Sequence, residues 1–266
     1  MTLKFCANLS FMFTETGSLL ERYNLARLAG FRGVESAFPK GFSIEDLLTA
    51  KQSLSQVLIN IRTGSVAGGE FGVAALCGDS NDPNYQEAFR SDLQTTVEYA
   101  KALECKKIHI MAGKVSKPTE DNRKVYVENL KYAANVLEKE NIVGLIEPIN
   151  KYAVPGYYLN SYETALDVLQ EINNPHIRLQ LDFFHLQHIK GNITHSVKDL
   201  LPFVGHVQIA QVPHRNEPST PGEIDYEYVL RMLAEEGYNG WVGCEYHPKT
   251  STNDGLGWIE KFGFKL

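Results

Sequence analysis

The stretch IVGLIE, residues 142–147, decides the fold together with the segment SYETALDVLQEI, residues 161–172, that follows it. The first segment is a short apolar run that is typical of a buried strand. The second segment repeats its apolar residues at the spacing of a helix. The same order of strand and then helix recurs along the whole chain.

The repeated unit is found by its strand-like runs and by the helical patterns between them. The strand-like runs are KFCANLS (4–10), FRGVES (31–36), SQVLINIR (55–62), KKIHIMA (106–112), IVGLIE (142–147), IRLQLD (177–182), GHVQIA (205–210) and GWVGCE (240–245). Further helical patterns cover residues 19–30, 85–103, 125–141 and 225–238. We therefore predict an α/β fold, a (β/α)₈ TIM barrel that forms a single domain over residues 1–266. A doubly wound sheet is the alternative, but NLSFMFTETG after the first strand is not a glycine-rich phosphate turn.

Composition limits the classes of partner. The 266 residues carry a net charge of -6, which disfavours a nucleic-acid partner because phosphate backbones bind basic surfaces. The N-terminal residues lack the continuous apolar run of a signal peptide, and no membrane partner is expected. The four cysteines form no CxxC pair, which favours free thiols and a cytoplasmic location. A homo-oligomer is left open.

Polar side chains stand at the ends of four successive strands. They are Glu147, Asp182, Gln208 and Glu245. In a barrel of this kind the active site lies at the carboxyl ends of the strands. Converging carboxylates repel one another unless a cation binds them, and oxygen ligands suit Mg²⁺ or Mn²⁺. We predict that these four residues bind a divalent metal ion; the alternative is that each is a solvated loop residue.

Other polar residues are candidates for contacts with a substrate. His185 follows Asp182 by three residues, and Arg215 lies in a long loop after the seventh strand. Glu70 lies in a long glycine-rich loop that is expected to close over the site, with a purely structural loop as the alternative. His206 is predicted to be a hydrogen-bond partner behind the ligands, and His109 is assigned to neither core nor site.

Several motifs resemble those of the hydroxypyruvate isomerase family, which belongs to the xylose isomerase-like TIM barrels. They are IHIMAG (108–113), IEPIN (146–150), PGYYLN (155–160), LDFFHLQ (181–187), GHVQIAQVPHRNEPSTPGEIDY (205–226) and GYNGWVGCEYHP (237–248). The loop motif GEFG (69–72) also fits, although bacterial members have arginine at the position of Phe71, so no role of that arginine is transferred.

The resemblance implies an isomerase that interconverts 3-hydroxypyruvate and 2-hydroxy-3-oxopropanoate (tartronate semialdehyde). It implies that Glu147 and Glu245 transfer the proton through an enediolate, that the four strand-end residues hold the metal, and that His185 and Arg215 contact a small hydroxy-oxo-acid substrate. It leaves open which glutamate acts first. The alternatives are a 2-oxo-tetronate isomerase or ketose 3-epimerase that uses the same site, an endonuclease IV-like nuclease, and a non-catalytic barrel. A nuclease would need a basic surface and more metal ligands, and a non-catalytic barrel would lack some of the four.

Overall fold

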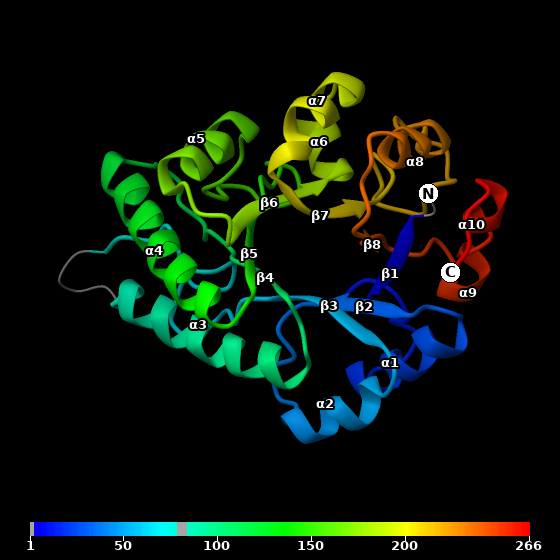
Figure 1. Cartoon of the computed structure of the whole chain (residues 1–266), viewed down its shortest axis with the longest axis horizontal. Coiled ribbons are helices and arrows are strands. Elements are labelled where there is room, and N and C mark those ends of the chain that lie inside the picture. Colours follow the sequence, from blue (N-terminus) through cyan, green and yellow to red (C-terminus); the bar gives the residue numbers. More distant parts are fainter. Residues whose placement is uncertain (1–2, 79–83) are drawn as a thin grey trace. The chain divides into compact units, whose positions relative to one another are not determined.

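The computed structural model describes residues 3–78 and 84–266, in which strands and helices alternate along the chain (Figure 1). The strands are β1 (Lys4–Asn8), β2 (Gly33–Ser36), β3 (Ser55–Asn60), β4 (Lys107–His109), β5 (Val143–Ile146), β6 (Ile177–Asp182), β7 (Val204–Ile209) and β8 (Trp241–Cys244). The helices are α1 (Leu19–Leu28), α2 (Ile44–Lys51), α3 (Tyr85–Ala102), α4 (Glu120–Lys139), α5 (Tyr162–Ile172), α6 (Phe183–Ile189), α7 (Ile193–Leu200), the 3₁₀ turn η1 (Leu201–Phe203), α8 (Tyr226–Glu235), α9 (Thr252–Gly255) and α10 (Trp258–Lys261).

The sheet has the topology of a closed barrel whose strands follow one another in chain order from β1 to β8. This confirms the predicted (β/α)₈ class. Within the described parts of the chain, no helix is long and apolar enough to cross a membrane. The chain divides into two compact units, one formed by the segments up to Val57 and from Leu181 onward, the other by Leu58–Gln180. The single domain over residues 1–266 stays a prediction.

Most predicted element boundaries differ from the observed ones by a few residues, and two of these differences have clear local reasons. Helix α4 begins before the predicted residue 125, because the backbone N–H of Thr119 donates to the Asn122 side chain in a capping box. Strand β4 ends at His109, before the predicted residue 112, where the N–H of Ala112 donates to the Tyr157 hydroxyl at 2.8 Å. A side chain thus replaces a strand partner at that point.

In the first unit, β1 lies between β2 and β8. Cys6 on β1 pairs in register with Gly33 on β2 and with Gly243 on β8. On the other side of β8, Gln208 of β7 pairs with the same Gly243. Because these strands are parallel, the carboxyl ends of β7, β8, β1 and β2 meet at one edge, where polar side chains gather.

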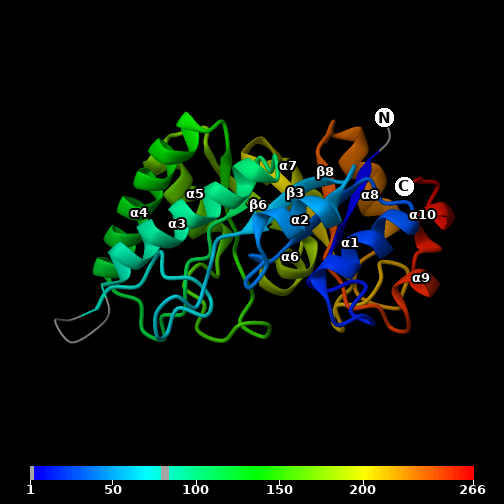
Figure 2. The same ribbon diagram turned by 90° about the horizontal axis from the view of Figure 1, so that it is seen from below.

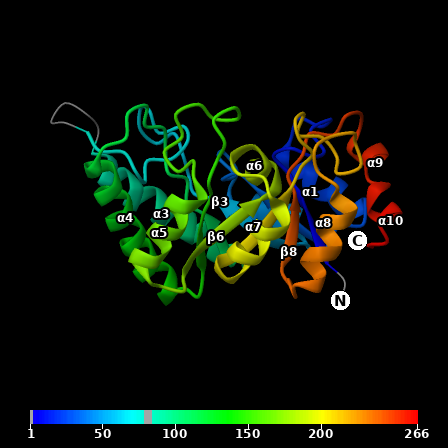
Figure 3. The ribbon, with the colours of Figure 1, turned by 90° about the horizontal axis from the view of Figure 1, so that it is seen from above.

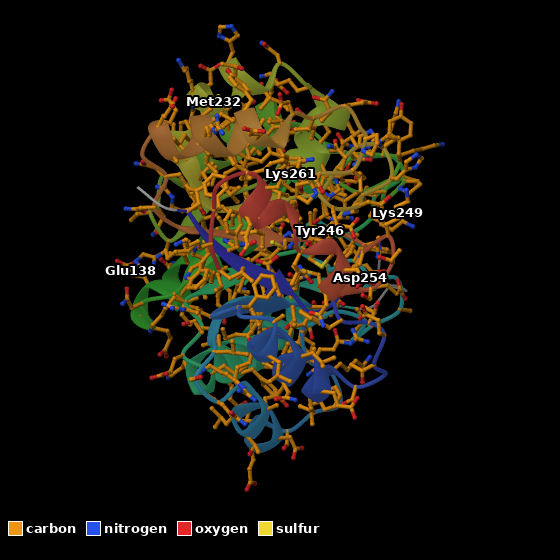
Figure 4. The ribbon with its side chains drawn as sticks, turned by 90° about the vertical axis from the view of Figure 1, so that its right-hand side faces the viewer. Glu138, Met232, Tyr246, Lys249, Asp254 and Lys261 are labelled. Carbon is orange, nitrogen blue, oxygen red and sulfur yellow. The ribbon has the colours of Figure 1, made fainter. Side chains whose placement is uncertain are left out.

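Helices pack on this part of the sheet through apolar and aromatic contacts. Helices α1 and α2 lie side by side (Figure 2), and so do α7 and α8 (Figure 3). Figure 4 shows α9 and α10, which carry Asp254 and Lys261, close to Tyr246. The ring of Trp258 on α10 meets Phe5 of β1 edge to face, with ring centroids 5.2 Å apart. Helix α10 therefore packs its aromatic side chain against β1 and covers that part of the core.

In the second unit, β4 lies between β3 and β5. Ile59 pairs with Ile108, and His109 pairs with Leu145. Helices α3 and α4 lie side by side, and α5 lies beside α4 (Figure 1). His109 and the residue after β5, Glu147, consequently stand at the carboxyl ends of neighbouring strands.

Candidate active site

A fully buried carboxylate, Glu35, lies at the carboxyl end of β2. Its Oε1 accepts hydrogen bonds from Asn8 Nδ2 at 2.9 Å and from Gln208 Nε2 at 2.7 Å. Its Oε2 lies 2.6 Å from His206 Nε2 and 3.6 Å from the Cys6 thiol. We call these five residues the Glu35 cluster. Burial acts to raise the pKa of Glu35, but the charge and hydrogen bond of His206 and the bonds from Gln208 and Asn8 lower it.

Glycine at position 243 makes room for this carboxylate. A Cβ atom added to Gly243 would lie 2.4 Å from Glu35 Oε1, so any larger residue on β8 would displace the Glu35 side chain. The sequence analysis missed Glu35. Its signal was present, since FRGVES is a predicted strand that delivers an acid near its carboxyl end, as the later strands do. His206 occupies the hydrogen-bonding role that was predicted for it.

Glu245, directly after β8, is held from two sides. Asn8 Nδ2 donates to Glu245 Oε1 at 3.2 Å, and the Arg215 guanidinium donates to Oε2. The same guanidinium nitrogen lies 3.4 Å from Oδ2 of Asp182. The structure thus brings together three of the predicted site residues, and it adds Asn8, which the sequence analysis did not select.

The guanidinium of Arg215 contacts two aromatic rings. Its central carbon Cζ lies over both, 4.6 Å from the ring centroid of Phe11 and 4.8 Å from that of Phe184. Cation–π attraction to both rings restrains the position of the guanidinium. Arg215 is therefore prepositioned as a fork for an anionic group, such as a carboxylate.

His185 and Asp182 occupy the start of α6. Asp182 is fully buried and caps the helix by accepting from the N–H of Phe184 at 2.8 Å. One turn along the helix, His185 Nε2 lies 3.6 Å from Asp182 Oδ2, and only 2% of His185 is exposed. The helix cap uses one carboxylate oxygen of Asp182 and leaves the other facing Arg215 and His185.

Glu147 belongs to the second unit, where it lies beside His109. Only 3% of Glu147 is exposed, and its Oε2 lies 3.5 Å from His109 Nε2. Burial raises the pKa of the nearby Tyr157 well above its usual range, and the charge of Glu147 adds to this rise. The structure therefore relates His109, left unassigned from sequence, to a predicted catalytic residue. Glu70, in the loop between β3 and α3, is exposed.

The predicted ligands of the first unit have the chemistry that a hard divalent cation requires. Asp182 is fully buried, the Glu245 side chain is 13% exposed, and both interact with the same guanidinium. Gln208 donates its amide N–H to Glu35, which directs its carbonyl oxygen away from that carboxylate. Two carboxylates and an amide oxygen fit Mg²⁺ or Mn²⁺.

Both of these carboxyl groups hold protons more tightly than usual. Burial raises the pKa of Glu245 to about 8, against the positive charge of Arg215 and with the added effect of the Asp182 and Glu35 charges. Burial likewise raises the pKa of Asp182 to about 6, against the charge of Arg215. A raised carboxyl pKa is the expected state of a cation site before its cation binds.

This shift predicts a pH dependence of stability in metal-free protein. The folded state binds the Glu245 proton more tightly than the unfolded state, whose pKa is near 4.5. The resulting stabilisation is complete below pH 4.5 and is lost as the pH rises toward 8. We expect the melting temperature in chelator to fall over this range more steeply for the wild type than for Glu245→Gln, which cannot titrate. Equal slopes in thermal unfolding would contradict the assignment.

Comparisons with known proteins place this chain in a family. The family described as "Xylose isomerase-like TIM barrel" matches residues 23–262. The chain is 40% identical to hydroxypyruvate isomerase of Escherichia coli (strain K12) over 264 residues, which covers 98% of this chain and 99% of the relative. It is 41% identical to 2-oxo-tetronate isomerase of Pectobacterium atrosepticum over 263 residues, which covers 97% of each.

Among solved structures, a crystal structure from Brucella melitensis described as "AP endonuclease, family 2" superposes with a TM-score of 0.91. It is 37% identical and covers 98% of this chain and 99% of its own. The chain belongs to the xylose isomerase-like TIM barrels and, within them, to the hydroxypyruvate isomerase family. The resemblance drawn from the motifs is thereby confirmed, and so is the prediction of an isomerase.

Proposed function

We propose that the protein interconverts 3-hydroxypyruvate and 2-hydroxy-3-oxopropanoate. The observation that carries this proposal is the arrangement around Glu245, a largely buried carboxylate, 13% exposed, held between Asn8 and Arg215, with Asp182 bound to the same guanidinium. A carboxylate with a raised pKa and an adjacent anion-binding fork suits proton transfer on a substrate that itself carries a carboxylate. The hydroxypyruvate isomerase from Escherichia coli, related over the full chain, supports the choice of substrate.

Arg215 is proposed to bind the substrate carboxylate. Its guanidinium is held by cation–π contacts with Phe11 and Phe184, so little side-chain freedom is lost when an anion binds. His185, buried one helical turn after Asp182, is proposed to donate a hydrogen bond to a substrate oxygen. Glu70 is proposed to contact the substrate from its loop.

Glu147 and Glu245 are proposed to transfer the proton. One glutamate removes a proton from C3 of hydroxypyruvate while the C2 carbonyl oxygen gains a proton, which gives an enediol. Return of a proton to C2 and loss of the proton from the C3 hydroxyl then produce the aldehyde. No atom is gained or lost in the sequence, as an isomerisation requires.

Glu147, Asp182, Gln208 and Glu245 are proposed to hold Mg²⁺ or Mn²⁺. When bound, the cation would supply positive charge near the oxygens on which negative charge develops. The oxygen-rich donor set and the raised pKa values of Asp182 and Glu245 support this choice.

Isomerisation of a 2-oxo-tetronate is the second candidate. The full-length relative from Pectobacterium atrosepticum carries that name. The same proton-transfer groups would serve, since only the length of the substrate beyond the reacting carbons differs. The solved ketose 3-epimerases are about 20% identical to this chain and support only the fold.

We also propose a cytoplasmic enzyme that has no nucleic-acid or membrane partner. In the described part of the chain the four cysteines form no disulfide, and Cys77 is exposed, which is compatible with a reducing compartment. The net charge of -6 disfavours binding to phosphate backbones, so the endonuclease description of the Brucella melitensis structure is not carried over.

The test is turnover by purified protein on hydroxypyruvate and on a 2-oxo-tetronate, with chelator and with added Mg²⁺ or Mn²⁺. We expect tartronate semialdehyde to form from hydroxypyruvate, with the larger kcat/KM, and chelator to remove the activity. A higher kcat/KM for the four-carbon acid would move the assignment to the second candidate. Turnover that persists at full rate in chelator would contradict the metal assignment, and cleavage of abasic DNA would contradict the isomerase assignment.

A further inference from the structure

We infer that Glu35 is a positioning residue that sets which way the amides of Asn8 and Gln208 face. In this way it presents the Gln208 oxygen to a divalent cation and an Asn8 N–H to Glu245. The inference rests on the proposed function, because it gives a role to a residue behind the proposed ligands. Glu35 itself, at the end of β2 and fully buried, is not one of those ligands.

The need for such a residue follows from the chemistry of an amide ligand. An amide group has nearly the same shape when its oxygen and nitrogen are exchanged, but only the oxygen can bind a cation. A neutral ligand such as Gln208 therefore works only if something selects one of the two orientations. A carboxylate that accepts hydrogen bonds and cannot donate them makes that selection, because it attracts the N–H₂ end of the amide.

The distances show that Glu35 performs this selection on two amides through one oxygen. Its Oε1 accepts from Gln208 Nε2 at 2.7 Å and from Asn8 Nδ2 at 2.9 Å. The other N–H of Asn8 donates to Glu245 at 3.2 Å, and its carbonyl oxygen accepts from the N–H of Ser10 at 3.0 Å. Each of these hydrogen bonds of the Asn8 side chain thus has a defined partner, and one partner is the proposed catalytic carboxylate of Glu245.

The surroundings of Glu35 keep it an acceptor. His206 Nε2 lies 2.6 Å from Oε2, and the Cys6 thiol also points at that oxygen. With two donors on each oxygen, the ionised form is favoured over a protonated acid, which would have to donate. Gly243 provides the space that this carboxylate occupies.

The competing explanation is that Glu35 and His206 form an ion pair that only stabilises the barrel. The two explanations differ in which property of residue 35 matters. Orientation of the amides requires an acceptor at Oε1, whether or not it is charged, whereas an ion pair requires the charge. Glu35→Gln removes the charge and keeps an acceptor there, because its N–H₂ can donate to Nε2 of a neutral His206 while two amide donors face its oxygen. Glu35→Met removes both at similar volume.

The experiment measures the Kd of metal-free protein for Mn²⁺ by calorimetry or electron paramagnetic resonance. We expect Glu35→Met to weaken Mn²⁺ binding by about 10- to 100-fold, and Glu35→Gln to stay within about threefold of the wild type. Gln56→Met is the matched control, since it removes another buried acceptor, for the Tyr23 hydroxyl at 2.7 Å, outside the Glu35 cluster. Thermal unfolding in chelator identifies variants that fail to fold.

A second substitution isolates orientation from stability. Gln208→Glu makes both terminal atoms of residue 208 oxygens, so no orientation has to be selected. In the wild-type background it should weaken Mn²⁺ binding, because the new carboxylate faces Glu35. In the Glu35→Met background it should restore binding by at least tenfold. Amide orientation predicts that this gain is larger than the gain from Gln208→Glu in the Glu35→Gln background, which also lacks the charge but keeps the acceptor; equal gains in the two backgrounds would mean that charge alone explains the reversal.

Other outcomes overturn the inference. Unchanged Mn²⁺ binding in Glu35→Met, equal losses in the Gln and Met variants, or no rescue by Gln208→Glu would each do so while leaving the proposed reaction in place. If the wild type binds no Mn²⁺, the inference fails together with the metal assignment. Turnover of hydroxypyruvate, measured on the same preparations, then reports separately on the reaction.

Discussion

Replacing Glu245 or Glu147 by glutamine lowers kcat for hydroxypyruvate by about 10²- to 10⁴-fold, the usual loss when a general acid or base is removed. Glutamine has nearly the same shape as glutamate, but its amide can act neither as a general acid nor as a general base near neutral pH. Glu245→Gln keeps one acceptor oxygen, which can face Arg215, and nearly the same side-chain shape, so its fold should persist. The loss then reports on chemistry and not on packing.

The measurement pairs turnover with exchange of the C3 hydrogens of hydroxypyruvate in deuterium oxide. The variant that lacks the first base should lose exchange and turnover together, whereas the other variant should keep more of the exchange. This result would identify the glutamate that removes the first proton. Glu138→Gln, an exposed acid on α4, is the control and should match the wild type. Full turnover in either active-site variant would show that its carboxylate does not transfer the proton.

Substituting Arg215 by methionine raises KM for hydroxypyruvate on the order of 30-fold or more. Loss of one partner of a buried charge pair commonly costs about 2–5 kcal/mol, and about 1.4 kcal/mol corresponds to a factor of ten. Methionine retains much of the apolar packing between Phe11 and Phe184 but offers no donor to a carboxylate. Arg215→Lys should recover only part of the effect, because an ammonium cannot form the planar fork.

Steady-state kinetics on hydroxypyruvate and on a neutral hydroxy-ketone tests this assignment. Poor binding confined to the carboxylate-bearing compound is the expected pattern. Arg231→Met, in an exposed ion pair with Glu227 on α8, is the matched control. An unchanged KM in Arg215→Met would remove Arg215 from the proposed carboxylate site, and Glu245 would then be its main partner.

The sequence alone determined the class of fold and the residues at the strand ends. Apolar runs of strand length and helical periodicities are local properties, so all eight strands could be located from them. The predicted strand 177–182 agrees with β6 at both ends, and 85–103 differs from α3 by one residue. The short helices α2, α6, α7, α9 and α10 were missed, since a few residues carry too little periodicity to reveal a helix.

Only the tertiary structure revealed what holds the strand-end residues in place. Asn8 and Glu245 are separated by 237 positions in the chain, and Glu35 and His206 by 171. No local pattern connects residues so distant, because parallel strands bring them together only when the sheet forms. The cation–π contacts of Arg215 with Phe11 and Phe184 likewise bring together three separate segments: the loop after β7, the loop after β1 and the start of α6. The local sequence thus shows which types of chemical group lie at the site. The orientation of these groups is decided by contacts that exist only in the folded chain.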